Sequence, residues 1–227
     1  MAIRMNRITD GSRLVEDDVC YFFGEYIAGG KWDASPTNNL IWNLKIDVAQ
    51  HPQRRHHKIS AINESIEQLA PAVSQESMSK VTVVPMPGSK PLGHAAYDDR
   101  MIQVMNGWGA RVGPAFDGRP VLVTRHERGA QHSAAAKGVS RATVAEMAAT
   151  LTLDPAYLAT PLRETVVLLD DVFTAGTSFK AAQSILMQRP EVKRVCGLFL
   201  ARTVWPPQAP AVDLSGLIAN LRARLGK

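Results

Sequence analysis

Short apolar runs alternate with amphipathic segments along most of the chain. The apolar runs predict strands at 81–84, 120–124, 165–172 and 194–203. Segments with helical spacing lie between them, at 95–112 (beginning near Asp98 and Asp99), 139–151 and 179–188. The run at 166–169 does not alternate with polar residues, which is typical of a parallel strand buried on both faces. We therefore predict an α/β fold: a parallel sheet with helices on both faces.

The first 75 residues have a different pattern. Gly and Pro punctuate the chain up to about residue 39, and 40–48 alternates as a strand does. A polar, basic connector at 51–58 precedes a predicted helix at 59–73, near whose end Pro71 lies. We expect three parts: a smaller N-terminal accessory subdomain at 1–75, a main domain at 76–205, and a C-terminal linker and helix at 206–227. That last helix should cover 214–225, with Asp213 as its N-cap.

Composition changes this picture only slightly. The chain has 227 residues, of which 45% are hydrophobic, a formal net charge of +5 and a pI near 9.4. That length suits one α/β domain with an appended subdomain. A basic balance fits a polyanionic ligand such as a nucleotide or a pyrophosphate sugar, and equally fits nucleic acid.

Two cysteines, Cys20 and Cys196, do not make a disulfide framework. The first twenty residues mix Arg, Asp and Glu, so we expect no signal peptide. No apolar run approaches the roughly 20 residues of a membrane span. These features predict a soluble cytoplasmic protein that does not associate with membranes.

Residues 166–178 carry the most specific chemical signal. Four apolar residues run into Asp170 and Asp171, and a small hydroxyl-rich loop at 174–178 follows. The acids fall near the carboxyl edge of the predicted sheet, where α/β proteins bind ligands. Backbone N–H groups at the start of a helix can hold a phosphate dianion. Carboxylates beside such a phosphate make sense if they accept hydrogen bonds from sugar hydroxyls or face a divalent cation, so the pattern indicates a ribose 5-phosphate ligand.

This stretch resembles the phosphoribosyl-pyrophosphate (PRPP) signature of the type I phosphoribosyltransferases, which is an apolar strand, two acids, a spacer and Thr-x-Gly-Thr-Ser or Thr. The resemblance implies that Asp170 and Asp171 bind the ribose 2- and 3-hydroxyls and touch Mg²⁺ directly or through water. It also implies a 5-phosphate loop made of Thr174, Ala175, Gly176, Thr177 and Ser178. The alternative is an ordinary strand–loop–helix with a capping Thr.

Two further segments resemble the same family, in particular its competence-related ComF-like branch. The turn at 85–90 (Pro-Met-Pro-Gly-Ser-Lys) resembles the pyrophosphate loop, with Gly88, Ser89 and Lys90 as the binding residues, although a plain proline-rich turn is the alternative. The long polar loop after the second strand resembles the mobile catalytic loop. Its candidate catalytic cations are Arg125, Arg128, Lys137 and Arg141, and the alternative is a solvated surface loop.

The resemblance covers about 76–205 and implies that 1–75 forms a variable hood over the acceptor. The implied activity is transfer of 5-phosphoribosyl from PRPP to a nucleobase or amine, with Mg²⁺ as cofactor and release of pyrophosphate. A homodimer is also implied, because the family is often dimeric. The alternative is a non-catalytic protein of the same fold that senses PRPP or a nucleotide and regulates nucleic acid. The residues do not identify the acceptor.

Overall fold

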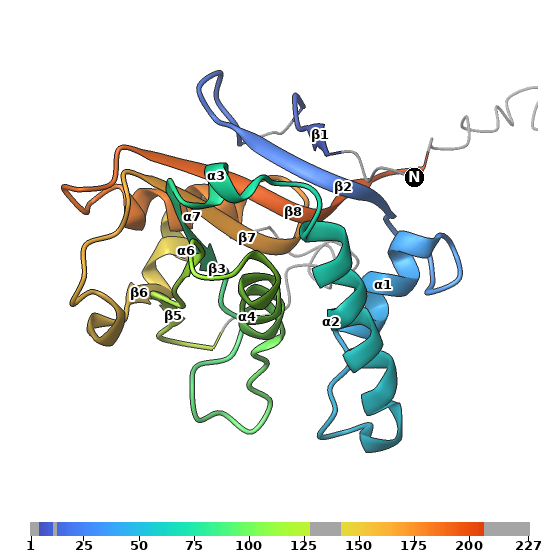
Figure 1. Cartoon of the computed structure of the whole chain (residues 1–227). Helices are drawn as coiled ribbons and strands as arrows, with labels where there is room; N and C mark the ends of the chain where they lie inside the picture. The colour runs from blue at the N-terminus through green and yellow to red at the C-terminus, as the bar shows by residue number, and fades with distance from the viewer. Residues whose placement is uncertain (1–4, 11–12, 128–141, 207–227) are drawn as a thin grey trace, which may run out of the picture.

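The computed structural model describes residues 5–10, 13–127 and 142–206, and its centre is a six-stranded sheet (Figure 1). The strand order is β1-β2-β8-β7-β3-β4, and every neighbouring pair is parallel except β1 with β2. This confirms the predicted α/β class and a mostly parallel sheet. The strands are β1 (Asn6–Arg7), β2 (Cys20–Ile27), β3 (Val81–Pro85), β4 (Asp117–Gly118), β7 (Thr165–Phe173) and β8 (Arg194–Val204).

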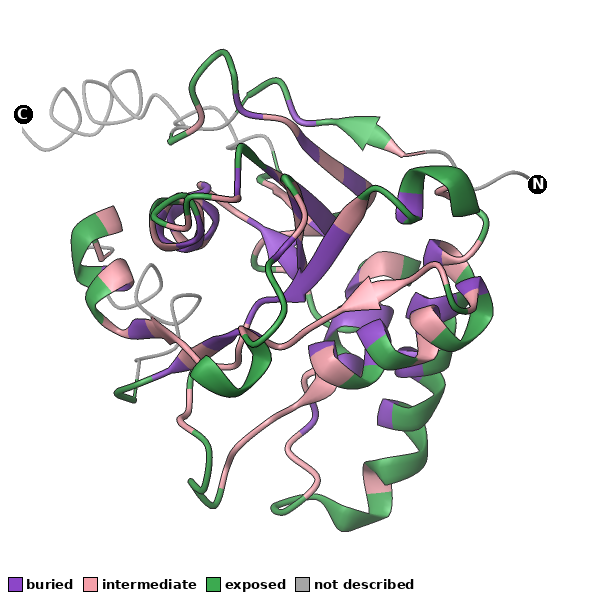
Figure 2. Ribbon diagram, turned by 60° about the vertical axis from the view of Figure 1, so that its left-hand side comes forward, coloured by how far each residue is buried: buried purple, intermediate pink, exposed green. Residues whose placement is uncertain are grey.

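Helices cover both faces of this sheet, as predicted (Figure 2). Residues of α1, α2 and α4 share one buried cluster with Val83 and Leu169, whereas residues of α6 and α7 share the other cluster with Val84 and Leu168. Successive strand residues thus alternate between the two cores. The helices are α1 (Pro36–Leu44), α2 (Arg55–Leu69), α3 (Gln75–Met78), α4 (Arg100–Val112), α6 (Val144–Ala149) and α7 (Thr177–Leu186), with 3₁₀ turns η1 (Pro52–Arg54) and η2 (Pro155–Tyr157). None of the helices in the described part of the chain is long and apolar enough to cross a membrane.

The predicted second strand does not join the main sheet, which corrects the sequence prediction. β5 (Leu122–Thr124) instead pairs antiparallel with β6 (Leu151–Leu153) in a separate two-stranded sheet. The chain pairs with β3 only at β4 and then reaches Pro120, which has no N–H to donate to a ladder. The helix predicted at 139–151 is also shorter than expected, because α6 begins after a capping box formed by Thr143 and Glu146.

The strand predicted at 40–48 is wrong, because α1 occupies most of that segment. The Oγ of Ser35 caps the helix by accepting a hydrogen bond from the N–H of Asn38 at 2.9 Å, and Pro36 follows at the first position. Leu40, Ile41 and Leu44 then share one buried helical face. The basic connector predicted at 51–58 is likewise partly helical, since α2 begins at Arg55.

Residues before 76 contribute to the main sheet and its core. β2 pairs in parallel with β8 over seven positions, from Cys20 opposite Gly197 to Ile27 opposite Val204. The boundary predicted at residue 75 therefore coincides with no boundary of the sheet or the core. The helix predicted at 214–225 and its N-cap Asp213 lie outside the described residues.

Candidate functional site

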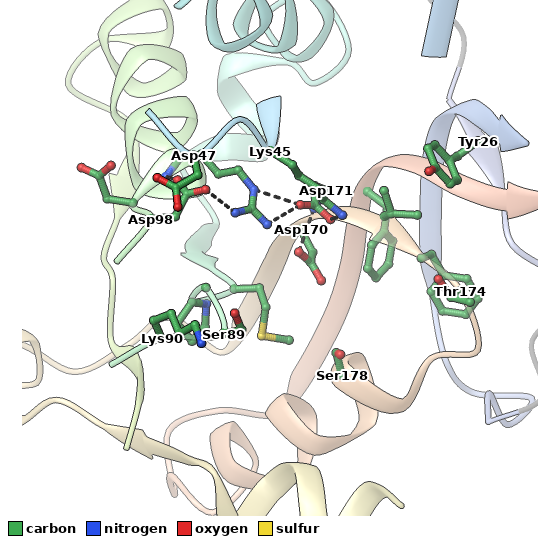
Figure 3. A pocket seen from close by; sticks show the side chains of 18 of the residues that line it. Tyr26, Lys45, Asp47, Ser89, Lys90, Asp98, Asp170, Asp171, Thr174 and Ser178 are labelled. Atoms are coloured by element: carbon green, nitrogen blue, oxygen red, sulfur yellow. Dashed lines mark hydrogen bonds and ion pairs between the residues drawn. The ribbon is translucent and has the colours of Figure 1, made fainter. Parts of the chain in front are cut away.

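A cavity of about 1010 Å³ lies at the carboxyl ends of β3, β7 and β8. Three segments singled out from the sequence line it together: Gly88–Lys90, the acids Asp170 and Asp171, and the loop at 174–178. The N-terminal segment supplies further lining residues, including Lys45, Arg55 and Lys58. Figure 3 shows the labelled members of this set around the end of β7.

The two acids lie inside β7 near its carboxyl end, rather than after it. β3 ends with Pro85 opposite Leu169, and the N–H of Met86 donates to the carbonyl of Leu169 at 2.8 Å. Both acids are therefore beyond the end of the neighbouring strand, where no chain covers them on that side. As adjacent strand residues they point to opposite faces, with Asp171 toward Lys45 and Asp170 toward the side of Ser89 and Ser178 (Figure 3).

Asp171 is held by two cations of the protein. Nε and Nη2 of Arg100 both donate to its Oδ2, at 3.0 and 2.7 Å, and Nζ of Lys45 lies 3.1 Å from its Oδ1. The residue is only 4% exposed. Burial alone would raise the pKa of Asp171, but Lys45 and Arg100 outweigh it and hold this pKa below its usual range. Asp171 is therefore an anion whose two oxygens are both engaged by cations.

This ion pair is part of a longer network that sequence analysis missed. Nη1 of Arg100 donates to Asp98 Oδ2 at 2.7 Å, and Nζ of Lys58 donates to Asp98 Oδ1 at 2.8 Å. Lys58 also donates to the carbonyl of Ile46 at 3.0 Å. The network joins α2, the start of α4, β7 and the end of α1. Its members are far apart in the sequence, and only the position of Asp98 near a helix start was visible there.

Asp170 has the opposite electrostatic environment. Burial, and then repulsion from Asp171, raise the pKa of Asp170 to about 7. Its Oδ1 accepts a hydrogen bond from the backbone N–H of Asp171 at 2.8 Å. Asp170 is thus the acid that gains and loses a proton near neutral pH, and the one on the side of the 174–178 loop.

That loop leads directly into the start of α7. Gly176 has φ = +86°, in the left-handed region, and a Cβ there would lie 3.2 Å from the ring of Phe173. α7 has no side-chain cap, so the N–H groups of its first turn face the loop without an intrahelical partner. The hydroxyls of Thr174 and Thr203 are hydrogen-bonded at 3.0 Å, which ties the loop to β8. This geometry suits an anion such as a phosphate group.

The loop after β3 is also fixed in place. Thr124 Oγ1 donates to the carbonyl of Gly88 at 2.7 Å, and a Cβ at Gly88 would lie 2.9 Å from the carbonyl oxygen of Asp98. Lys90 forms an ion pair with Glu127, which also lies 3.6 Å from Nε2 of His94. The cation predicted to hold pyrophosphate thus already has a carboxylate partner.

The candidate loop cations have mixed outcomes. Arg125 is exposed, donates to Thr152 Oγ1 at 3.2 Å and does not line the cavity. Arg128, Lys137 and Arg141 lie outside the described residues.

No protein-family model matches the chain, and no curated protein is significantly similar to it. The chemistry of this cavity is therefore the basis for inferring function.

Proposed function

We propose that the protein transfers a 5-phosphoribosyl group from PRPP to a nitrogen nucleophile and releases pyrophosphate. The observation that supports this most is the meeting of three segments at one cavity: the acid pair of β7, the loop that starts α7 and the Gly88–Lys90 turn. The cavity volume of about 1010 Å³ is enough for a phosphorylated sugar and a second reactant.

In this reaction the bond between C1 of the ribose and the pyrophosphate oxygen breaks, and a bond from C1 to the acceptor nitrogen forms. Positive charge builds on the ribose ring as the leaving group departs, as in glycoside chemistry. Asp170 would accept hydrogen bonds from ribose hydroxyls and stabilise that charge, while the start of α7 would hold the 5-phosphate. Lys90, once released from Glu127, would bind pyrophosphate.

The described residues fit Mg²⁺ in part. Mg²⁺ commonly binds one or two carboxylates together with substrate phosphates and waters, and Asp170 is the carboxylate placed for this. Asp171 does not fit as a direct ligand, because Arg100 and Lys45 engage both of its oxygens. Among the residues that the structure describes, no group of three or more His, Cys, Asp or Glu could hold a metal by itself. Bound together with PRPP, Mg²⁺ would neutralise charge on the pyrophosphate.

A screen for PRPP-dependent release of pyrophosphate, across nucleobases and small amines, tests the proposal. Asp170→Asn should abolish most of that release, whereas Asp33→Asn, far along the chain in an exposed turn, should not. PRPP that binds without any turnover across the panel would argue against an enzyme.

That outcome would favour the second candidate, a protein that senses PRPP or a nucleotide without turnover. Two contacts support this reading: Asp171 is engaged by protein cations, and Lys90 is engaged by a protein carboxylate. Both groups would have to change partners in a catalytic cycle, whereas a sensor needs only the phosphate loop and Asp170.

A further inference from the structure

A second cavity, of about 400 Å³, adjoins the first one. The two share three lining residues, Tyr26, Lys45 and Asp47. The volume lies near the lower end of the range for small-molecule sites. The second cavity is therefore large enough for a single ring system beside the ligand of the first. Its full lining is Tyr26, Ile41, Trp42, Lys45, Ile46, Asp47, His51 and Arg54.

One part of this lining is apolar and aromatic. Ile41 and Ile46 are almost fully buried, whereas Trp42 is 42% exposed, although Ile41 and Leu44 on the same helix are buried. Tyr26 is half-buried at the end of β2. Aromatic faces of this kind favour a flat, apolar partner.

The other part of the lining is cationic. Arg54 is half-buried, and within the described part of the chain no carboxylate lies within ion-pair distance of it. Asp47 does not neutralise it: Asp47 Oδ1 accepts hydrogen bonds from the N–H groups of Ala49 and Gln50, at 2.9 and 3.3 Å, which close its own turn. Lys45 is paired with Asp171. The guanidinium of Arg54 is thus available for a planar anion, which it can bind through two parallel hydrogen bonds.

We propose that this second cavity binds a planar aromatic carboxylate, with the ring against Trp42 and Tyr26 and the carboxylate on Arg54. The site needs no PRPP and does not depend on the phosphoribosyl transfer proposed above. Lys45 connects the two cavities, since it lines both and holds Asp171. A second anion near Lys45 competes with Asp171 for that cation, so binding in the two cavities is coupled and each ligand changes the affinity for the other by the same factor.

Titration calorimetry on the full chain without PRPP tests the site directly, with nicotinate and benzoate as probes and nicotinamide as the uncharged isostere of nicotinate. Nicotinate should bind at least about tenfold more tightly than nicotinamide. Arg54→Gln should bring nicotinate down to the nicotinamide level, and Trp42→Ala should weaken both. Arg111→Gln is the matched control, because Arg111 is an exposed arginine that lines neither cavity.

The proposal is overturned if neither nicotinate nor benzoate binds, if nicotinate and nicotinamide bind equally, or if Arg54→Gln leaves nicotinate affinity unchanged. Should Arg54→Gln fail to fold, Arg54→Lys replaces it: this variant keeps the charge but loses the planar fork, so affinity should fall by an intermediate factor. The comparison of nicotinate with nicotinamide uses the unaltered protein and decides the matter in either case.

Discussion

Arg100 donates two hydrogen bonds to a single carboxylate oxygen of Asp171, from Nε at 3.0 Å and from Nη2 at 2.7 Å. The remaining nitrogen, Nη1, donates to Asp98 at 2.7 Å. One buried guanidinium therefore neutralises two carboxylates that lie on different elements, and the neighbouring charges raise the pKa of Arg100 above its usual value in spite of burial. This contact is what makes the two adjacent acids of β7 chemically different.

Arg100→Met should strongly destabilise the fold. Asp98 and Asp171 would each keep one lysine but lose the planar donor between them, and breaking a buried ion pair by removing one partner costs about 3–5 kcal/mol. The free energy of unfolding, measured by urea denaturation at neutral pH, gives this number. Arg111→Met is the control, because Arg111 forms an exposed pair with Glu67 and its loss should change stability by less than about 0.5 kcal/mol. Equal effects of the two substitutions would mean that the network does not hold the strand end in place.

Asp170→Asn should remove a specific pH dependence of stability. The carboxyl of Asp170 has a raised pKa, about 7, in the folded protein, against an ordinary value of about 3.9 in the unfolded chain. Between these two values the folded state binds more protons than the unfolded state, so stability should fall as the pH rises through that window. Asp171 acts in the opposite sense at lower pH: its depressed pKa contributes stability above about 3.9 that is lost on acidification.

Urea denaturation of the parent protein and of Asp170→Asn, at several pH values from about 4 to 8, measures this effect. The stability advantage of the Asn variant should grow with pH, by up to about 1.4 kcal/mol for each unit of pKa shift, and then level off. Turnover by the variant should be low throughout, because the acid that titrates near neutral pH is gone. Two curves that stay parallel would place Asp170 in solvent rather than in the environment described.

Sequence patterns anticipated the local parts of this site well. Residues 166–178 form a strand, a loop and a helix start because each step depends on neighbouring residues, such as Gly176 at a left-handed position. The pattern did not reveal that Asp171 is engaged, because Lys45 and Arg100 reach it from distant segments. A pattern of two adjacent acids predicts two equivalent ligands, and only tertiary packing makes them different.

The same limitation explains the errors in the fold. Residues 40–48 alternate in a way that fits a strand, but Ser35 and Pro36 begin a helix just before them. β5 has the composition of a core strand, yet Pro120 precedes it and its partner β6 comes from a segment predicted to be helical. The choice of strand partner is a long-range property that apolar periodicity does not carry.

Ser178→Asp should weaken the binding of PRPP without harming the fold. Ser178 is half-buried in the first turn of α7, and its side chain lines the cavity. A carboxylate in the first turn of a helix stabilises that helix by about 0.3–1 kcal/mol, but it would occupy and repel the anion site. Calorimetric titration should show PRPP affinity falling at least about tenfold, with an unchanged or higher melting temperature. Ser178→Ala controls for the lost hydroxyl and should have a much smaller effect; if both variants bind PRPP as tightly as the parent, the 5-phosphate is held elsewhere.

Glu127→Gln should increase the affinity for pyrophosphate. Glu127 is exposed, and its hydrogen bond and ion pair with Lys90 hold the pKa of Glu127 below its usual range, so the pair is intact at neutral pH. A pyrophosphate group that binds Lys90 must displace this carboxylate. Removing the charge should therefore tighten binding by up to about fivefold, the factor expected for one exposed ion pair, and less at high salt. Glu67→Gln, which frees Arg111 away from the cavity, is the control for overall charge. Lys90→Met should have the opposite effect to Glu127→Gln; if Glu127→Gln weakens binding instead, then Glu127 itself contacts the ligand and Lys90 is not the pyrophosphate-binding cation.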